Sequence, residues 1–180
     1  KRLQDEVRNV NGEYAELVAT SRANLSGQAR IHAAVLALLA AKSFEHLIEI
    51  ATSDMAVHID VDAVSLCIEP ADGASPRGRL KGVSILEQGT VESLLGRKRD
   101  ALLRPYVAGD PVLFGPAAGI VRSDALVRLD LGAGGPPGLL AIGSREEGKF
   151  LPAQGTELLI FLGRVLGLSI RSWLDLPDGD

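Results

Sequence analysis

The N-terminal residues carry an apolar side chain at alternating intervals of four and three, and this pattern constrains the fold more than any other in the chain. The series is Leu3, Val7, Val10, Tyr14 and Leu17. Such spacing is the heptad seam of a helix that packs against another helix. The other sides of these turns are mostly polar. So narrow a stripe is typical of a seam between helices rather than of a helix lying on its own domain.

The same spacing continues past Leu17, but its middle is polar. Ser21, Asn24 and Gln28 follow, and then Ile31, Val35 and Leu38. We favour one long dimerisation helix over residues 1–41, with Gly27 as the point where it could bend. Two helices broken near residues 24–27, with a polar residue capping the second, are the alternative.

The apolar face widens between residues 31 and 39, where Ala34, Leu36 and Leu39 join it. We expect the helix to pack on the globular part there. Nearer the N-terminus we expect a homodimer interface, formed by Leu3, Val7, Val10, Tyr14, Leu17, Ser21 and Asn24. The flanking positions offer no opposite charges, so they do not encode whether the two helices run parallel or antiparallel.

We expect residues 42–176 to form one domain, followed by a tail at 177–180. Ser43 is the expected N-cap of a second helix that ends near Val57. Strands are expected at 63–68, 83–86, 112–114, 125–131 and 139–143, and two more helices at 91–95 and 153–174. The segment 71–82, rich in Gly, Pro and charge, is expected to be a loop. Strands in the middle and helices at both ends predict an α+β fold, with an antiparallel sheet and helices on one side.

This pattern resembles a GAF-type sensor domain and, more narrowly, the bacterial family known as domain of unknown function 484. The residues that carry the resemblance are Ala40-Ala41-Lys42-Ser43-Phe44-Glu45-His46-Leu47, Arg122-Ser123-Asp124-Ala125-Leu126, Gly138-Leu139-Leu140-Ala141-Ile142-Gly143-Ser144, Phe150, Gln154-Gly155-Thr156-Glu157-Leu158-Leu159 and Phe161-Leu162. The resemblance implies a GAF-like sheet flanked by helices. It also implies a module that binds a small molecule or dimerises, with any pocket between the sheet and the irregular middle segment.

Charge and cysteine content exclude several classes of protein. The net charge is −4, from 19 Lys and Arg against 23 Asp and Glu, whereas nucleic-acid binders usually carry a basic excess. No apolar run has the length of a membrane span, and the first residues lack the apolar core of a signal peptide. The single cysteine, Cys67, precludes disulfides within the chain. We therefore expect a cytoplasmic protein with no membrane or nucleic-acid partner.

The chain shows no pattern of a catalytic site or of a cofactor site. His32, His46 and His58 are far apart and lack a nearby cysteine or carboxylate cluster, so no metal site is expected. Cys67 lies mid-strand, where a buried structural thiol is expected. We expect no enzyme and no cofactor.

One set of residues is a candidate ligand site. An arginine fork and a hydroxyl from Arg104, Arg122 and Ser123 could hold a carboxylate or phosphate, although a solvated basic face is the competing interpretation. The sequence therefore predicts a non-catalytic, homodimeric GAF-like module that senses a small anion or signals through its long helix. A structural adaptor with no ligand pocket is the alternative, and a filled apolar core between the sheet and the middle segment would favour it.

Overall fold

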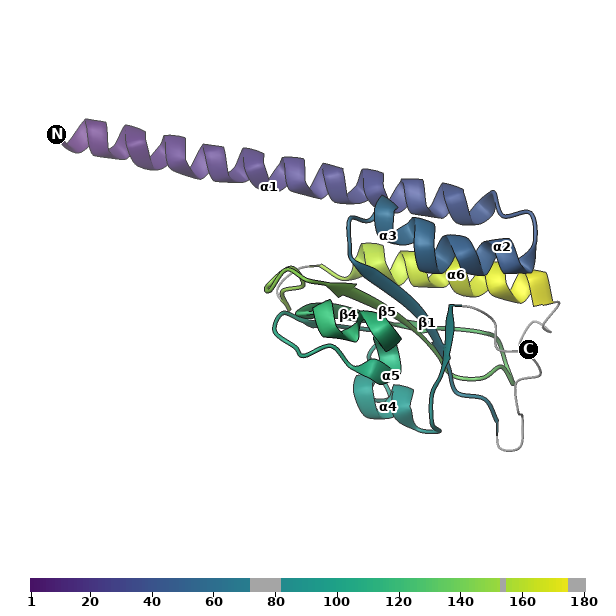
Figure 1. Cartoon of the computed structure of the whole chain (residues 1–180). Helices are drawn as coiled ribbons and strands as arrows, with labels where there is room; N and C mark the ends of the chain where they lie inside the picture. The colour runs from purple at the N-terminus through teal and green to yellow at the C-terminus, as the bar shows by residue number, and fades with distance from the viewer. Residues whose placement is uncertain (72–81, 153–154, 175–180) are drawn as a thin grey trace.

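The N-terminal helix is continuous and extends well past the rest of the molecule. The computed structural model describes residues 1–71, 82–152 and 155–174. Helix α1, Arg2–Leu39, runs without a break through Gly27, which confirms one helix rather than two. Its second half lies over the domain and its first half projects into solvent (Figure 1).

The domain is built on a five-stranded sheet with the strand order β2-β1-β5-β4-β3. The strands are β1 Ala63–Ile68, β2 Val83–Ile85, β3 Ala101–Arg104, β4 Ser123–Leu129 and β5 Gly138–Ser144. The hairpin of β4 and β5 forms as expected, and β5 is central. Neighbouring strands are antiparallel except β1 and β2, which are parallel. A parallel pair needs a connection of about a dozen residues or more, and residues 69–82 supply that length.

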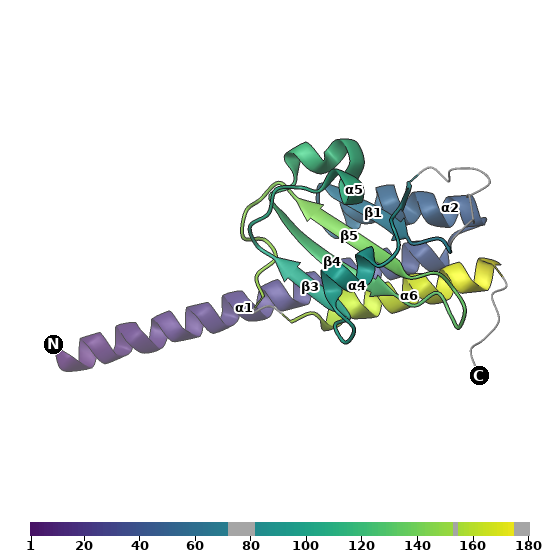
Figure 2. The ribbon, with the colours of Figure 1, turned by 90° about the horizontal axis from the view of Figure 1, so that it is seen from below.

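Helices cover both faces of this sheet, so the expectation that they lie on one side was wrong. One face carries α1, α2 Phe44–Glu49, the π-helical turn Ile50–Asp54, α3 Met55–His58 and α6 Glu157–Leu174. The other carries α4 Thr90–Leu95, α5 Pro111–Phe114 and the 3-10 helix Gly115–Ile120. Figures 1 and 2 show the two layers on opposite sides of the strands. The short helices come from the middle segment, where the sequence pattern is weakest.

Two elements of that middle segment differ from the prediction. Residues 112–114 are helical, because Asp110 caps the turn by accepting a hydrogen bond from the Val112 N–H at 2.8 Å and Pro111 occupies the first helical position. The third strand is instead Ala101–Arg104, at the sheet edge beside β4. The basic run before it obscured the short alternation of Ala101 and Leu103, which point into the core.

Local signals placed the second helix correctly. The Ser43 hydroxyl accepts a hydrogen bond from the His46 N–H at 3.0 Å, as expected of an N-cap. The final helix begins at Glu157, later than expected. Most of the predicted loop 71–82 and the tail 177–180 lie outside the described residues. None of the helices in the described part of the chain combines the length and apolar character needed to cross a bilayer.

Candidate functional site

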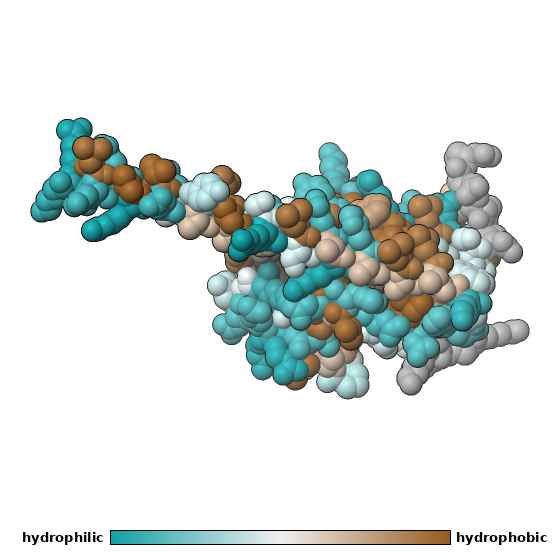
Figure 3. Space-filling view, turned by 90° about the horizontal axis from the view of Figure 1, so that it is seen from above, coloured by the Kyte–Doolittle hydropathy of each residue, from teal (hydrophilic) through white to brown (hydrophobic). Residues whose placement is uncertain are grey.

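The apolar stripe of α1 is exposed along the projecting half of the helix. Leu3, Val7, Val10, Tyr14 and Leu17 are between 55% and 76% exposed, and every residue from 1 to 17 is exposed. Figure 3 shows several brown, hydrophobic side chains along the free helix, on the face seen from above. A monomeric protein rarely leaves a continuous apolar stripe in water, so this stripe is the main candidate interaction site.

The heptad series does not stay exposed in the second half of α1. Ser21 and Asn24 are exposed, but Ile31 and Leu38 are buried in the domain core beside Ala34. Leu36 and Leu39, which we expected to pack on the domain, instead face solvent. The helix therefore presents one apolar face to its own domain and a different one to solvent.

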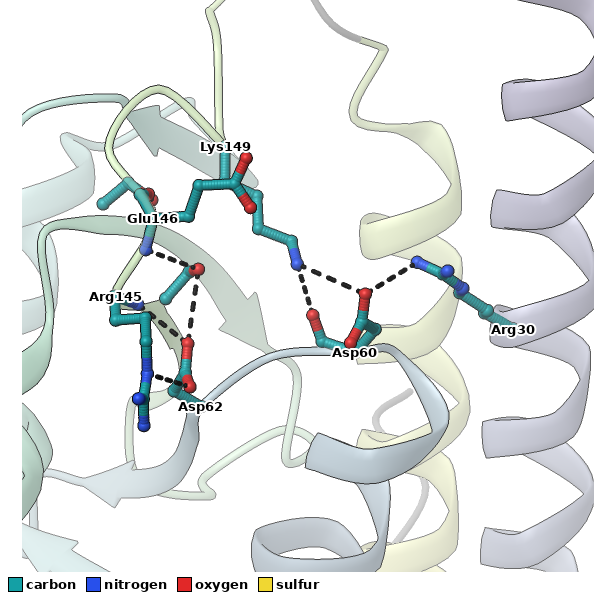
Figure 4. A network of polar contacts seen from close by, with 8 residues as sticks. Arg30, Asp60, Asp62, Arg145, Glu146 and Lys149 are labelled. Atoms are coloured by element: carbon teal, nitrogen blue, oxygen red, sulfur yellow. Dashed lines mark hydrogen bonds and ion pairs between the residues drawn. The ribbon is translucent and has the colours of Figure 1, made fainter.

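Polar contacts hold α1 to the loop that follows α3, as Figure 4 shows. Arg30 Nη1 of α1 lies 3.4 Å from Asp60 Oδ2, and Lys149 Nζ lies 3.8 Å from the same oxygen. Lys149 also donates a hydrogen bond to the Asp60 carbonyl. Asp60 has φ 57°, the left-handed conformation that Asp and Asn adopt more readily than most residues. These contacts join the helix to the end of the sheet.

Asp62, two residues further on, is the second acidic group of this network (Figure 4). Its carboxylate accepts hydrogen bonds from the Arg145 backbone N–H at 2.8 Å and from Arg145 Nε at 2.7 Å. The backbone hydrogen bond is the largest influence on the pKa of Asp62, and with the Arg145 side chain it outweighs desolvation and lowers that pKa. Asp62 is therefore ionised at neutral pH, and its hydrogen bonds with Arg145 position the loop.

Arg104, from the predicted anion site, is already paired inside the protein. Its Nε donates to Asp124 Oδ1 at 2.7 Å and its Nη2 to Asp124 Oδ2 at 2.6 Å. This hydrogen-bonded pair raises the pKa of Arg104. The Asp124 carboxylate therefore takes the two-point contact that Arg104 would offer to another anion.

Arg122 and Ser123 also have protein partners. Arg122 Nη1 donates to the carbonyls of Gly119 and Val121, each at 3.0 Å. The buried Ser123 hydroxyl donates to the Glu146 carbonyl at 2.6 Å. Surface hollows of about 340 to 680 Å³ on the described part of the chain are lined by other residues. Anion binding at Arg104, Arg122 and Ser123 stays a prediction, and these contacts favour a structural role for all three.

Apolar side chains of the middle segment pack closely against β5, while a hollow of about 670 Å³ remains beside β1, between Val64 and Phe114. Leu113, Phe114 and Val121 are buried there against β5. A Cβ placed on Gly143 of that strand would meet Val121 Cγ2 at 2.7 Å and a Phe114 ring carbon at 2.9 Å. The middle segment therefore rests directly on the strand backbone, at the place where the sequence resemblance implied a pocket.

Comparison with known proteins assigns the chain to a family. The sequence pattern described as "Protein of unknown function, DUF484" matches residues 1–175. The chain belongs to the DUF484 family. No curated protein matches it. Among solved structures, the GAF domain of a phosphoenolpyruvate-protein phosphotransferase from Acinetobacter is similar, with a TM-score of 0.58 and 16% identity over 83% of this chain and 95% of that one. At that identity the likeness shows the fold, and the GAF-like expectation is confirmed.

Cys67 of this DUF484 chain is a buried thiol, as expected. Burial raises its pKa to about 11, so that at neutral pH it is an unreactive, protonated thiol. Within the described residues, His, Cys, Asp and Glu form no cluster of three that could hold a metal ion.

Sequence reasoning missed the buried carboxylates of the DUF484 domain. Asp124 pairs with Arg104, and Glu69 accepts hydrogen bonds from the N–H groups of Gly89, at 3.0 Å, and Val91, at the start of α4. The partners of each carboxylate are about 20 residues away in sequence, and no short-range spacing signals them. Asp124, an acidic residue inside a largely apolar strand, offered a hint of a buried carboxylate.

Proposed function

We propose that this DUF484 chain is a non-catalytic GAF-like module that forms a homodimer through the projecting half of α1. The observation that carries the proposal is the exposed apolar stripe Leu3, Val7, Val10, Tyr14 and Leu17, on turns that lie beyond the domain. Each large apolar side chain contributes about 1.5–3 kcal/mol when it is fully buried. A partner helix is the element that can bury a stripe so narrow.

The projecting half also needs a partner to be stable as a helix. Propensity alone supplies little stability, and most helical stability in proteins comes from packing of an amphipathic face. Gly12 lies in the middle of this half, where a Cβ would meet no neighbouring segment within 4 Å, and a glycine there costs about 0.5–1 kcal/mol relative to alanine. Packing against a second helix offsets this cost.

Three of the five stripe residues match the preferences of a two-stranded coiled coil. Val7 occupies an a position, where β-branched side chains favour two strands, and Leu3 and Leu17 occupy d positions. Polar Ser21 follows on the same seam, and a polar seam residue restricts the register of the pair. A second copy of this chain offers the matching stripe.

The close packing over β5 supports the adaptor form of this function over a small-molecule sensor. Leu113, Phe114 and Val121 occupy the face where a GAF ligand would sit. The polar groups of Arg104 and Ser123 are bonded within the protein. The domain then serves as a rigid body attached to the dimerising helix.

Light scattering coupled to size exclusion tests the proposal. The chain should elute at micromolar concentration with twice the 19.0 kDa mass of one copy. Val7→Glu with Val10→Glu should weaken dimerisation at least 100-fold, because two carboxylates per chain would enter the seam. The matched control is Ala15→Glu with Ala19→Glu, which adds the same charge on other faces of α1 and should leave the dimer intact. A monomeric wild-type chain would overturn the proposal.

A further inference from the structure

The buried half of α1 raises the question of where the dimer seam goes after Leu17. The heptad series leads to Ile31 and Leu38, which are 5% and 1% exposed within their own domain. They cannot also face a second copy. The large apolar residues that remain exposed in this half are Leu25, Leu36 and Leu39, each more than 60% exposed.

These exposed leucines follow an interval of 11 residues that begins at the N-terminus. Leu3, Tyr14, Leu25 and Leu36 are 11 residues apart, as are Leu17, Gln28 and Leu39. Eleven residues make three turns of about 3.67 residues, close to the natural 3.6 of an α-helix. A heptad drifts by roughly 20° per repeat, or about 80° over the four repeats from Leu3 to Ile31. The exposed stripe therefore continues along the 11-residue interval, while the heptad turns into the core.

The continued stripe is free of charge. Beyond Leu17 it consists of Ser21, Leu25, Gln28, His32, Leu36 and Leu39, without an Asp, Glu, Lys or Arg. The charged residues of α1, such as Glu13, Arg22 and Arg30, lie at other positions around the helix. In Figure 3 brown side chains run from the tip of the helix onto the upper face of the domain, all visible from one side. An occupant of this face must be long and must match three leucines and the polar residues Ser21, Gln28 and His32.

We propose that a second copy of this chain covers the whole length of α1, parallel and in register, with Leu25, Leu36 and Leu39 in the interface. This proposal rests on the proposed dimer and extends its contact from the projecting half onto the domain. In a parallel pair, the polar residues Gln28 and His32 meet their own copies. An antiparallel pair over the whole stripe would place Val10 against His32 and Tyr14 against Gln28, which buries polar groups against apolar ones.

The area that a stable dimer requires supports the longer contact. Specific interfaces bury about 800 Å² per partner and involve roughly 20–30 residues a side. Five stripe residues on the free half are few by that measure, whereas a contact over the 38 residues of α1 supplies a seam more than twice as long. The pair would be nearly straight or slightly right-handed, as an 11-residue repeat requires, and the two domains would be held side by side.

Oxidative cross-linking of single cysteines tests the seam directly. Leu25→Cys and Leu36→Cys should each form a disulfide-linked dimer in high yield, because a parallel, in-register pair brings each residue to its own copy. The adjacent Ser26→Cys, exposed on another side of α1, is the matched control and should cross-link at least 10-fold more slowly. Cys67 is buried and does not compete. In light scattering, Leu36→Glu with Leu39→Glu should weaken dimerisation at least 10-fold.

The outcomes separate this inference from the dimer itself. If Val7→Glu with Val10→Glu dissociates the dimer while Leu36→Glu with Leu39→Glu does not, and Leu36→Cys fails to cross-link, the dimer stands and the extended seam is wrong. Cross-linking of Ser26→Cys as fast as Leu25→Cys also overturns the extended seam. A monomeric wild-type chain overturns both. Circular dichroism of each glutamate variant establishes that the domain is folded, since these side chains are exposed.

Discussion

Arg104 and Asp124 face each other directly across the β3–β4 pair and share two hydrogen bonds of 2.7 and 2.6 Å. The Asp124 side chain is fully buried and that of Arg104 is 29% exposed. The pair joins the edge strand β3 to its neighbour β4 through their side chains. It also explains why an arginine that looked available for an anion is occupied by a carboxylate of its own fold.

Arg104→Met should destabilise the domain by about 3–5 kcal/mol, because it leaves the Asp124 carboxylate buried without a partner. Urea denaturation measures the free energy of unfolding. Adding Asp124→Leu to the first substitution should recover much of the loss, since an apolar pair can replace a buried ion pair at little cost. The control Arg97→Met removes an exposed pair with Glu92 and should leave the free energy of unfolding almost unchanged, because solvent screens an exposed ion pair. Equal losses in the two arginine variants would contradict this interpretation.

Phe114→Ala should cost about 3–5 kcal/mol, because the ring fills the space over β5 and its removal leaves a cavity. Thermal or urea unfolding provides the measurement. Val112→Ala, on the same short helix but 52% exposed, is the control and should stay within about 0.5 kcal/mol of the wild type. A near-neutral Phe114→Ala would mean that this face tolerates empty space, which would reopen the case for a ligand there.

The lowered pKa of Asp62 predicts a pH dependence with a definite sign. The folded pKa lies below that of the unfolded chain, so the stability it contributes is present above the unfolded pKa of about 3.9. That stability is lost as the pH falls through the folded pKa. Carbon-detected NMR titration of the Asp62 carboxyl measures the shift.

The cause of the Asp62 shift can be tested separately. Its largest contribution is the hydrogen bond from the Arg145 backbone N–H, which the side-chain truncation Arg145→Ala retains. The pKa of Asp62 should therefore rise in Arg145→Ala but remain below its usual value. A complete return to that value would show that the guanidinium carries the effect.

Gly167→Ala should destabilise the domain although alanine is the better helix former. A Cβ at this position of α6 would lie 2.6 Å from the Asp130 carbonyl oxygen, so the helix would have to move away from the sheet. Gly27→Ala, in the interior of α1 with the nearest atom at 4.0 Å, is the opposite case. It should stabilise by up to about 1 kcal/mol. Chemical denaturation of the two variants should give changes of opposite sign.

Patterns within a few residues predicted most of the fold. The Ser43 cap, the alternation in β1, β4 and β5, and the glycine-rich hairpin between the last two strands are local features whose hydrogen bonds and faces depend on near neighbours. The Asp110-Pro111 cap was equally local, but the apolar residues after it were misread as a strand. No local sequence pattern predicts that β1 and β2 pair in parallel, because a long connection permits either strand direction.

Some features of the candidate sites also follow from local sequence patterns, and others depend on tertiary packing. That α1 is a long helix with an apolar stripe followed from spacing alone, since a helix of period 3.6 displays its own pattern. Which apolar face the domain buries, with Ile31 and Leu38 inward and Leu36 and Leu39 outward, was decided by tertiary packing. The partner of Arg104 was decided there too. Both depend on contacts between segments far apart in the chain, whose relative positions local periodicity does not encode.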